Sequence, residues 1–429
     1  MNGEYIFDIS SSAHRSHDLE SYEYHTFYPS QNSDLNNFSD IRIVINNKDP
    51  YFHFHNAYIE IKGKLVKKTG GTAFAKTDKI AFTNNPIPFM FRNFTYKING
   101  SIVESVDYPG HVCTMLAQCL NNGGKRYTSG LIYCWYADTS TEADGTKNKG
   151  WEIRRKLVLE EAEPIGSFTF QIPLTMIFGF AEFKKVISGV THEFQMTRQE
   201  DFYALFQKDA GEGKITLDHL RIWVPVAKPA GQTQINLKEN QLTRKKSYAI
   251  DFYKRRGLMV VLPTAVTEWV WNLDISGFQE RARYLILGFQ LARTTDQKSN
   301  YAIFDNSDVK RMSCYVNDVC MPYVRAESNF KSNDFGNFYR QLQDFSSNYL
   351  QIDPILRESG INPMDFKKLF PYFCFDLTKR KREIEGDVAN ACVKVSFGTA
   401  TSANLRCYAC LLSEKQLLIE ADGSDMVIR

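Results

Sequence analysis

Two histidines one residue apart, His53 and His55, are the side chains whose types and spacing best suit a metal ion. They stand near the start of an expected strand, on which residues two apart share a face, so both imidazoles could bind one metal. The nearest following carboxylate, Glu60, is one residue out of phase and points to the opposite face. No second metal-binding motif is evident. We therefore expect these histidines to lie on a surface or an interface, without a metal.

Cys407 and Cys410 form a Cys-x-x-Cys pair within another expected strand. Alternation along the strand places the two thiols on opposite faces, whereas a zinc ribbon or a redox motif needs a turn there. The chain has nine cysteines, an odd number that fits reduced thiols better than a disulfide framework. The sequence therefore predicts buried thiols. The other seven are Cys113, Cys119, Cys134, Cys314, Cys320, Cys374 and Cys392.

Signatures of the common enzyme classes are missing from the sequence. It contains no phosphate-binding glycine loop of the G-x-x-x-x-G-K-[ST] or G-x-G-x-x-G type and no G-x-S-x-G elbow. The adjacent carboxylates Glu160 and Glu161 lie in a charged loop, where we expect them to be solvated. Two distant carboxylates can still meet in a fold, which keeps glycoside hydrolysis open as an alternative. We predict no enzyme, and no catalytic, cofactor-binding or metal-binding residues.

Three basic clusters remain as candidates for phosphate binding or nuclear import. They are Arg244-Lys245-Lys246, Lys254-Arg255-Arg256 and Lys379-Arg380-Lys381-Arg382. The last is the best candidate because it follows an expected strand directly. The formal net charge is only +3, which argues against a protein that coats nucleic acid with its whole surface. We favour solvated loops for all three clusters and expect no sequence-specific binding of nucleic acid.

Composition favours an all-β protein of two domains. The 429 residues exceed what one hydrophobic core usually organises. Aromatic residues make up 14%, with 31 Phe and 22 Tyr, and such residues suit half-buried pleated surfaces. No run of about 18 apolar residues could span a bilayer. Residues 1–20 lack the features of a signal peptide, so we expect a protein made and kept in the cytosol or nucleus, with reduced cysteines.

Short strand patterns separated by turn signals follow an arm at residues 1–40, for which a disordered terminus without a role is the alternative. The first half predicts strands at 41–45, 54–66, 89–106 (two strands around Asn99-Gly100), 167–174, 190–198 and 214–226. It also predicts a helix at 111–120, a loop at 139–150 and a linker at 227–234. The second half predicts strands at 267–275, 284–291, 312–316, 371–377, 391–397, 405–412 and 416–420, and a helix at 335–345. Trp269 and Trp271 share one strand face and are expected in the core.

The two halves of the chain run in parallel. Residues 96–100 match 314–318, since each segment is a strand entering a tight turn and is followed by a helix. Residues 168–172 likewise match 373–377, and 220–224 match 405–409. Each half has about eight strands, the number that a jelly roll needs. The sequence predicts two tandem eight-stranded jelly-roll β-sandwiches with short helical insertions: an arm at 1–40, a first roll at 41–230 and a second at 231–429.

These segments resemble the double jelly-roll major capsid proteins of the polinton and adintovirus kind, which are relatives of virophage and adenovirus capsid proteins. The likeness is carried by residues 84–104, by 172–180 with the following strand at 190–198, and by 214–225. It extends over most of residues 40–420 in strand order. It rests on the pattern of strands and turns, without a catalytic signature, and the short chain implies modest surface loops.

The resemblance implies a structural protein of the virion capsid that trimerises into pseudo-hexameric capsomers tiling an icosahedral shell. Its expected partners are two further copies of the chain, neighbouring capsomers, and penton and minor capsid proteins. No cofactor and no small-molecule substrate are implied. Synthesis in the host cytoplasm is expected, with nuclear assembly as an option, and the arm would tie capsomers together. The alternatives are a host-genome copy of such a gene, a carbohydrate-binding or carbohydrate-cleaving β-sandwich protein, and a cupin-like metalloenzyme.

Overall fold

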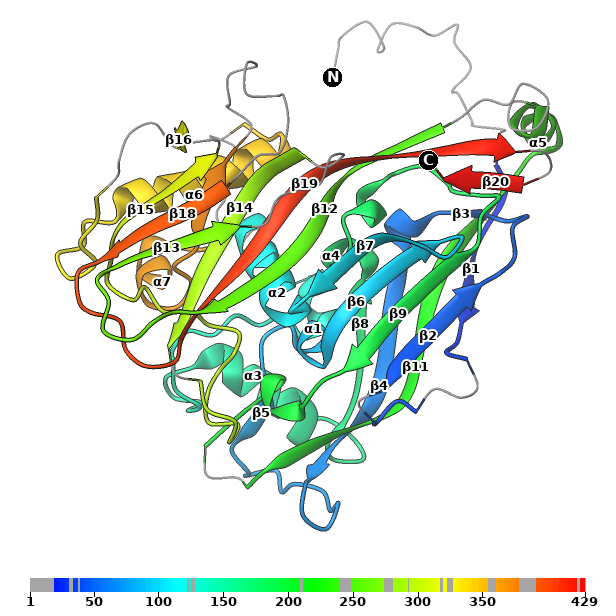
Figure 1. The fold of residues 1–429 in the computed structure, drawn as a ribbon. Helices are drawn as coiled ribbons and strands as arrows, with labels where there is room; N and C mark the ends of the chain where they lie inside the picture. Colours follow the sequence, from blue (N-terminus) through cyan, green and yellow to red (C-terminus); the bar gives the residue numbers. More distant parts are fainter. Residues whose placement is uncertain are drawn as a thin grey trace, which may run out of the picture.

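Two units follow one another along the chain, and each consists of two facing antiparallel sheets (Figure 1). The computed structural model describes residues 19–30, 34–37, 39–121, 124, 128–208, 211–239, 248–273, 281–291, 293–316, 319–321, 327–353, 360–377, 391–422 and 425–428. Buried and exposed residues alternate along strands such as Asp40–Ile45 and Ala391–Phe397, because successive side chains of a strand point to opposite faces. The inward faces of the sheets form the core.

The first unit has one sheet in the order β1-β11-β4-β8 and a second in the order β2-β9-β6-β7. The first sheet consists of β1 (Leu19–Phe27), β11 (Gly213–Pro229), β4 (Tyr58–Lys67) and β8 (Ser167–Pro173), with β3 (Tyr51–Phe52) also paired to β11. The second consists of β2 (Asp40–Ile45), β9 (His192–Arg198), β6 (Phe91–Ile98) and β7 (Ser101–Asp107). A small sheet pairs β5 (Ile80–Phe82) with β10 (Leu205–Gln207). The helical segments are η2 (Phe54–Asn56), α1 (Pro86–Phe89), α2 (Pro109–Leu120), η4 (Ser129–Tyr133), α3 (Lys149–Leu159), α4 (Leu174–Ile177), η5 (Phe180–Glu182) and η6 (Asp201–Tyr203).

The second unit repeats this architecture with sheets in the orders β12-β19-β14-β17 and β13-β18-β15-β16. The first of these consists of β12 (Tyr248–Val261), β19 (Leu405–Asp422), β14 (Arg281–Leu291) and β17 (Phe373–Asp376), with β20 (Asp425–Ile428) also paired to β19. The second consists of β13 (Glu268–Leu273), β18 (Ala391–Phe397), β15 (Val309–Val316) and β16 (Val319–Met321). Helix α5 (Gly231–Lys238) leads into this unit, and α6 (Gly336–Leu350) and α7 (Pro363–Lys368) lie between β16 and β17.

The strand order makes the two units equivalent position by position. β1, β11, β4 and β8 correspond to β12, β19, β14 and β17, and β2, β9, β6 and β7 correspond to β13, β18, β15 and β16. The three segment pairs matched in the sequence fall on corresponding strands, namely β6 with β15, β8 with β17 and β11 with β19. In both units a helix, α2 or α6, follows the hairpin. The predicted double jelly roll is therefore confirmed.

Several predicted boundaries differ from the structure. Residues 19–27 were expected in the arm but form β1, whose backbone pairs with β11 although its side chains are mostly exposed. The expected linker at 227–234 comprises the end of β11 and the start of α5. β12 and α3 were not predicted, and the expected strand at 416–420 is part of the long β19. Trp269 and Trp271 are half-buried at the edge of the core, with ring centroids 5.8 Å apart.

One continuous cluster of buried apolar side chains runs through both units. In the first unit its centre is aromatic, with the rings of Tyr96 and Phe180 stacked at a centroid distance of 3.6 Å. In the second, Phe289 contacts Phe373 and, across the sandwich, Phe397. Within the described ranges, no helix combines the length and apolar character needed to cross a membrane.

Candidate functional site: the junction of the two units

The two histidines and the carboxylate singled out in the sequence do not converge. His53 caps the short 3-10 turn η2 and His55 lies within it, so the two are not on a strand as expected; their ring centroids are 6.0 Å apart. Glu60 instead accepts hydrogen bonds from Arg221 and Gln171 at 2.7 Å each. Tyr22 Oη lies 2.8 Å from His53 Nδ1. Burial, and then the neighbouring His55, lower the pKa of His53. Over the described part of the chain, no group of three or more His, Cys, Asp or Glu side chains is placed to hold a metal.

The Cys-x-x-Cys pair lies in the interior of β19, where both thiols are buried and burial raises their pKa values. None of the nine cysteines forms a disulfide. Of the basic clusters, residues 244–246 and 379–382 lie outside the described residues. The remaining cluster, Lys254-Arg255-Arg256, is different from what we expected, because Arg255 is only 1% exposed. Its predicted place in a solvated loop is wrong, since it belongs to β12 and faces the first unit.

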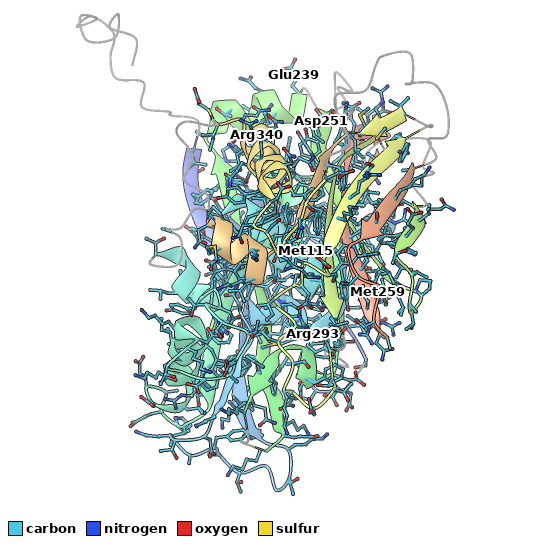
Figure 2. All side chains as sticks on the ribbon, turned by 90° about the vertical axis from the view of Figure 1, so that its left-hand side faces the viewer. Met115, Glu239, Asp251, Met259, Arg293 and Arg340 are labelled. Carbon is cyan, nitrogen blue, oxygen red and sulfur yellow. The ribbon has the colours of Figure 1, made fainter. Side chains whose placement is uncertain are left out.

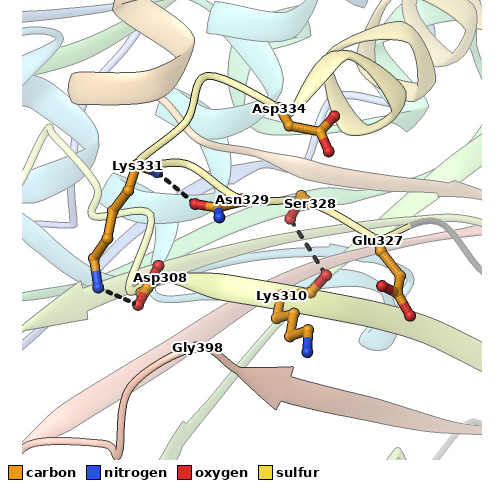
Figure 3. Close-up of a pocket in the computed structure, with 8 residues that line it drawn as sticks. All are labelled: Asp308, Lys310, Glu327, Ser328, Asn329, Lys331, Asp334 and Gly398. Carbon is orange, nitrogen blue, oxygen red and sulfur yellow. Dashed lines mark hydrogen bonds and ion pairs between the residues drawn. The ribbon is translucent and has the colours of Figure 1, made fainter.

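A polar pocket of about 310 Å³ lies in the second unit beside β15 (Figure 3). Its charged groups neutralise one another: Lys331 Nζ lies 3.0 Å from Asp308 Oδ2, and Glu327 pairs with Arg311, whose hydrogen bond and charge lower the pKa of that carboxyl. Ser328 Oγ donates to the Val309 carbonyl at 2.6 Å and is thereby occupied. We find no activated nucleophile or base among these lining residues.

The most distinctive arrangement of polar groups lies between the two units. Glu104, in the middle of β7, is fully buried and accepts N–H bonds from Gly179 (3.0 Å), Phe180 (3.1 Å) and Arg255 (2.8 Å). Burial raises the pKa of Glu104, and the charge of Arg255 and the three N–H bonds oppose that rise. Two of these N–H groups belong to the first unit and one to the second. The carboxylate thus joins the backbones of both units at one point.

The Arg255 side chain continues this network into the first unit. Its Nη2 donates to Glu182 Oε1 at 2.6 Å and to the Thr175 carbonyl at 2.9 Å. Tyr349, from α6, donates to the same Glu182 carboxylate at 2.8 Å. Burial alone would lower the pKa of Arg255, but the facing charges, led by Glu182, outweigh it and raise the pKa. Arg255 is therefore a cation at any physiological pH and is held against the first unit.

Two glycines allow the backbones to touch across the junction. A β-carbon at Gly179 would lie 1.8 Å from the Tyr253 carbonyl oxygen, and one at Gly257 would lie 1.9 Å from the Asp107 carbonyl oxygen. Neither distance is sterically possible, and the obstructing atoms are backbone atoms that cannot turn aside. Any larger residue at these positions would push the units apart.

Helix α2 fills the space beside this network and packs on the second unit. His111 stacks on Tyr408 with ring centroids 3.7 Å apart, and its Nε2 lies 3.2 Å from Gln290 Oε1. Burial lowers the pKa of His111 to about 3, so the ring is neutral. Cys119 hydrogen-bonds Cys374, and burial with this contact raises the pKa of the Cys374 thiol. The helix is therefore part of both cores.

A third set of contacts joins the segment after β14 to the first unit. The Gln297 side chain exchanges two hydrogen bonds of 2.8 Å with the backbone of Gly213. Asp138 is buried and binds Arg154 at 2.6 Å within the first unit and Asn300 of the second unit at 2.9 Å. Like the network around Glu104 and Arg255, these contacts offer no reactive group, but they fix one unit against the other.

Sequence reasoning missed this junction because buried charges look like surface charges in a sequence. One signal was present: residues 248–261 carry β-branched and aromatic residues around Lys254-Arg255-Arg256, which favours a strand over a solvated loop. The contacts of Glu104, Asp138 and Gln297 depend on how two units sit together. No local pattern reports that arrangement.

Comparisons with known proteins agree with this architecture. A family model described as a double jelly roll-like domain matches residues 80–417, more than half of the chain. A chain of the Sputnik virophage superposes with a TM-score of 0.63 at 10% identity, covering 96% of this chain and 89% of the other. The mavirus major capsid protein gives 0.54 at 10% identity, with 95% and 90% covered. The Faustovirus major capsid protein gives 0.55 at 7% identity, with 98% and 94% covered.

At such identities the similarity to the solved structures is one of fold. No curated protein is significantly similar to the chain in sequence. The family model matches the strands from β5 to the interior of β19, so it covers parts of both units and leaves out β1 to β4 and β20. The chain therefore belongs to the double jelly roll-like domain family.

Proposed function

We propose that the chain is a major capsid protein that trimerises into pseudo-hexameric capsomers and tiles an icosahedral viral shell. The observation that carries this proposal is the pair of units with the same strand order, held at one buried junction. Such a chain supplies two of six similar lobes, so three copies make a six-lobed block. The mavirus and Faustovirus proteins of the same fold are major capsid proteins, which supports this function.

The proposal gives the chain a structural and not an enzymatic role. Its partners would be two further copies, neighbouring capsomers, and penton and minor capsid proteins, and its place would be the virion after synthesis in the host cytoplasm. The boundaries 1–40, 41–230 and 231–429 stay a prediction. The pairing of β1 with β11 supports a shorter arm that ends before Leu19.

The mass of the purified protein in solution tests this function. Sedimentation should give three times the chain mass of 49.4 kDa, and negative-stain images should show hexagonal blocks. A stable monomer that forms no hexagonal block at high protein concentration would contradict the proposal.

A further inference from the structure

Two of the nine cysteines differ from the buried thiols that the sequence predicts. Cys320, on β16, and Cys392, on β18, are partly exposed, whereas the other seven are buried. Both lie in the sheet β13-β18-β15-β16 of the second unit. This sheet lies at the left in Figure 1, and Figure 2 views the molecule from that side. The contact with the first unit is made by the other sheet of this unit, through Arg255 and Gly257 of β12.

The two thiols flank one tyrosine on the outer face of their sheet. Tyr315, on β15, pairs with Cys392 on one side and with Cys320 on the other. Side chains that are directly opposite across antiparallel strands share a face, so the three residues form a row, the thiol row. Its two cysteines are two strand spacings apart, about 10 Å. A disulfide needs Cα atoms within about 7 Å, so these two thiols cannot bond to each other.

The surroundings of the thiol row suit a reactive thiol. Lys394, two residues after Cys392 and on the same face, holds its ammonium group 4.4 Å from the centre of the Tyr315 ring. Reactive cysteines are partly exposed and lie in electropositive surroundings. Since the other seven cysteines are buried, the sulfur to which a thiol of this row can bond comes from outside the chain.

The face around the row suits contact with a second copy of the chain. Val270, on β13, lies opposite Lys394 and is 51% exposed, and Glu268 is on the same face. The face combines an exposed apolar side chain with charges of both signs, so two identical faces can meet without net repulsion. Because the row has Tyr315 at its centre and a thiol at each end, a two-fold axis through Tyr315 brings thiol against thiol at both ends.

We propose that the thiol rows of two copies join by disulfide bonds across such a two-fold axis and link neighbouring capsomers covalently. This inference rests on the proposed function, which places many copies side by side in a shell. A two-fold contact cannot lie inside a three-fold ring, so the linked chains belong to different trimers.

The oxidant is a low-molecular-weight disulfide such as oxidised glutathione. The thiolate of Cys392 attacks one sulfur of this disulfide, which forms a mixed disulfide and releases one small thiol. A thiolate of the second copy then attacks the protein sulfur, so the bond between the chains forms and the second small thiol leaves. The two chains lose two protons and two electrons, which the small disulfide takes up. In the reducing cytosol the thiols stay reduced, and the bonds form when the shell reaches oxidising conditions.

Oxidation of the purified protein by oxidised glutathione tests this link. After unreacted thiols are blocked, a denaturing gel without reductant should show a band at twice the chain mass of 49.4 kDa, which dithiothreitol removes. The product should stop at two chains, because paired rows use up each other's thiols, and a ladder of longer products would contradict the two-fold contact. The double variant Cys320→Ser, Cys392→Ser nearly keeps the size of both side chains and should give no such band.

A second pair of variants tests the contact separately from the thiols. Val270→Glu buries a charge in the contact and should slow the formation of the linked dimer about tenfold. Val261→Glu, at a valine 52% exposed on β12, is the matched control and should react at the rate of the wild type. Both variants should sediment like the wild-type trimer, which shows that they are folded.

Three results would overturn the inference while the proposed function stands. One is a wild type that forms hexagonal blocks but no linked dimer. The second is a dimer band that survives in the double variant, which places the bond at a buried cysteine. The third is an equal rate in Val270→Glu and Val261→Glu, which leaves only chance collisions between thiols. A monomeric wild type would instead overturn the proposed function and, with it, the link between capsomers.

Discussion

Glu104 and Arg255 are charged side chains with almost no exposure to solvent. A buried pair of this kind adds little net stability over an apolar pair, because both charges lose their hydration. The pair instead determines how the two units are oriented. The Glu104 carboxylate is satisfied only where the N–H groups of Gly179, Phe180 and Arg255 converge, and this occurs at one orientation of the two units. The network therefore specifies one orientation of the two units.

Removing one charge from this network should cost far more than removing an exposed charge. Arg255→Met takes the guanidinium away from Glu182, and we expect the free energy of unfolding to fall by about 3–5 kcal/mol. Arg283→Met is the control, since its ion pair with Glu414 is partly exposed and contributes about 1 kcal/mol or less. Urea unfolding followed by tryptophan fluorescence measures both. Similar losses in the two variants would show that the buried network is dispensable.

His111 makes stability depend on pH. Its pKa is about 3 in the folded chain and about 6.5 when exposed, so the unfolded chain binds an extra proton between these values. Stability is complete above pH 6.5 and falls as the pH falls towards 3, by about 1–2 kcal/mol at pH 5 for this residue. His111→Phe keeps an aromatic ring against Tyr408. Between pH 7 and pH 5, its free energy of unfolding should fall by about 1–2 kcal/mol less than that of the wild type.

Urea unfolding at the two pH values measures this difference. His192 has the same direction of shift, to about 3 by burial, so the His111→Phe variant should keep part of the acid sensitivity. His219→Gln replaces an exposed histidine on β11 and should behave like the wild type. An unchanged acid sensitivity in His111→Phe would mean that the ring is not held neutral at the junction.

At the scale of elements, the sequence predicts those strands that have one apolar and one polar face. β2 was expected at 41–45 and spans Asp40–Ile45, and β18 was expected at 391–397 and has those bounds, because an apolar residue occupies every second position of both. β1 lacks that alternation, since its outer face is open and aromatic. β12 also lacks a clear alternation of apolar and polar residues, because its outer face is buried by the other unit. The two long strands that sequence reasoning missed are thus β1 and β12, whereas the other missed strands, β3, β5, β10, β16 and β20, are only two to four residues long.

Truncation separates β1 from the chain before it. Removal of residues 1–18 should leave the proposed trimer intact and reduce the yield of shells in an assembly assay, because the arm is expected to tie capsomers together. Removal of residues 1–30 also takes β1 from the edge of β11 and Phe27 from its contact with Phe52. We expect it to lower the free energy of unfolding by roughly 2 kcal/mol or more. An unchanged free energy of unfolding after the longer truncation would contradict a stabilising role of β1 at the edge of β11.

At the scale of the whole molecule, the repetition of one unit was predictable and the orientation of its two copies was not. Three segment pairs share a local pattern of strand, turn and helix, and a local pattern is what a sequence displays. The junction joins β7 to β12 and α2 to β19, strands and helices separated by more than a hundred residues, through side chains whose neighbours no spacing reveals. The repeated strand pattern therefore follows from the sequence, whereas the angle between units follows from contacts such as those of Glu104, Arg255, Gln297 and Asp138.

The continuous core predicts that the two units unfold together. Tyr408, Cys410 and Leu412 of β19 are buried, and part of their cover comes from α2 of the first unit. A fragment of residues 248–428 would expose this surface, so we expect it to bind a hydrophobic dye and to aggregate. The whole chain should unfold in one calorimetric transition whose enthalpy equals the van't Hoff enthalpy. Two separate transitions, or a soluble fragment with the melting temperature of the whole chain, would show that each unit is stable alone and that the junction only orients them.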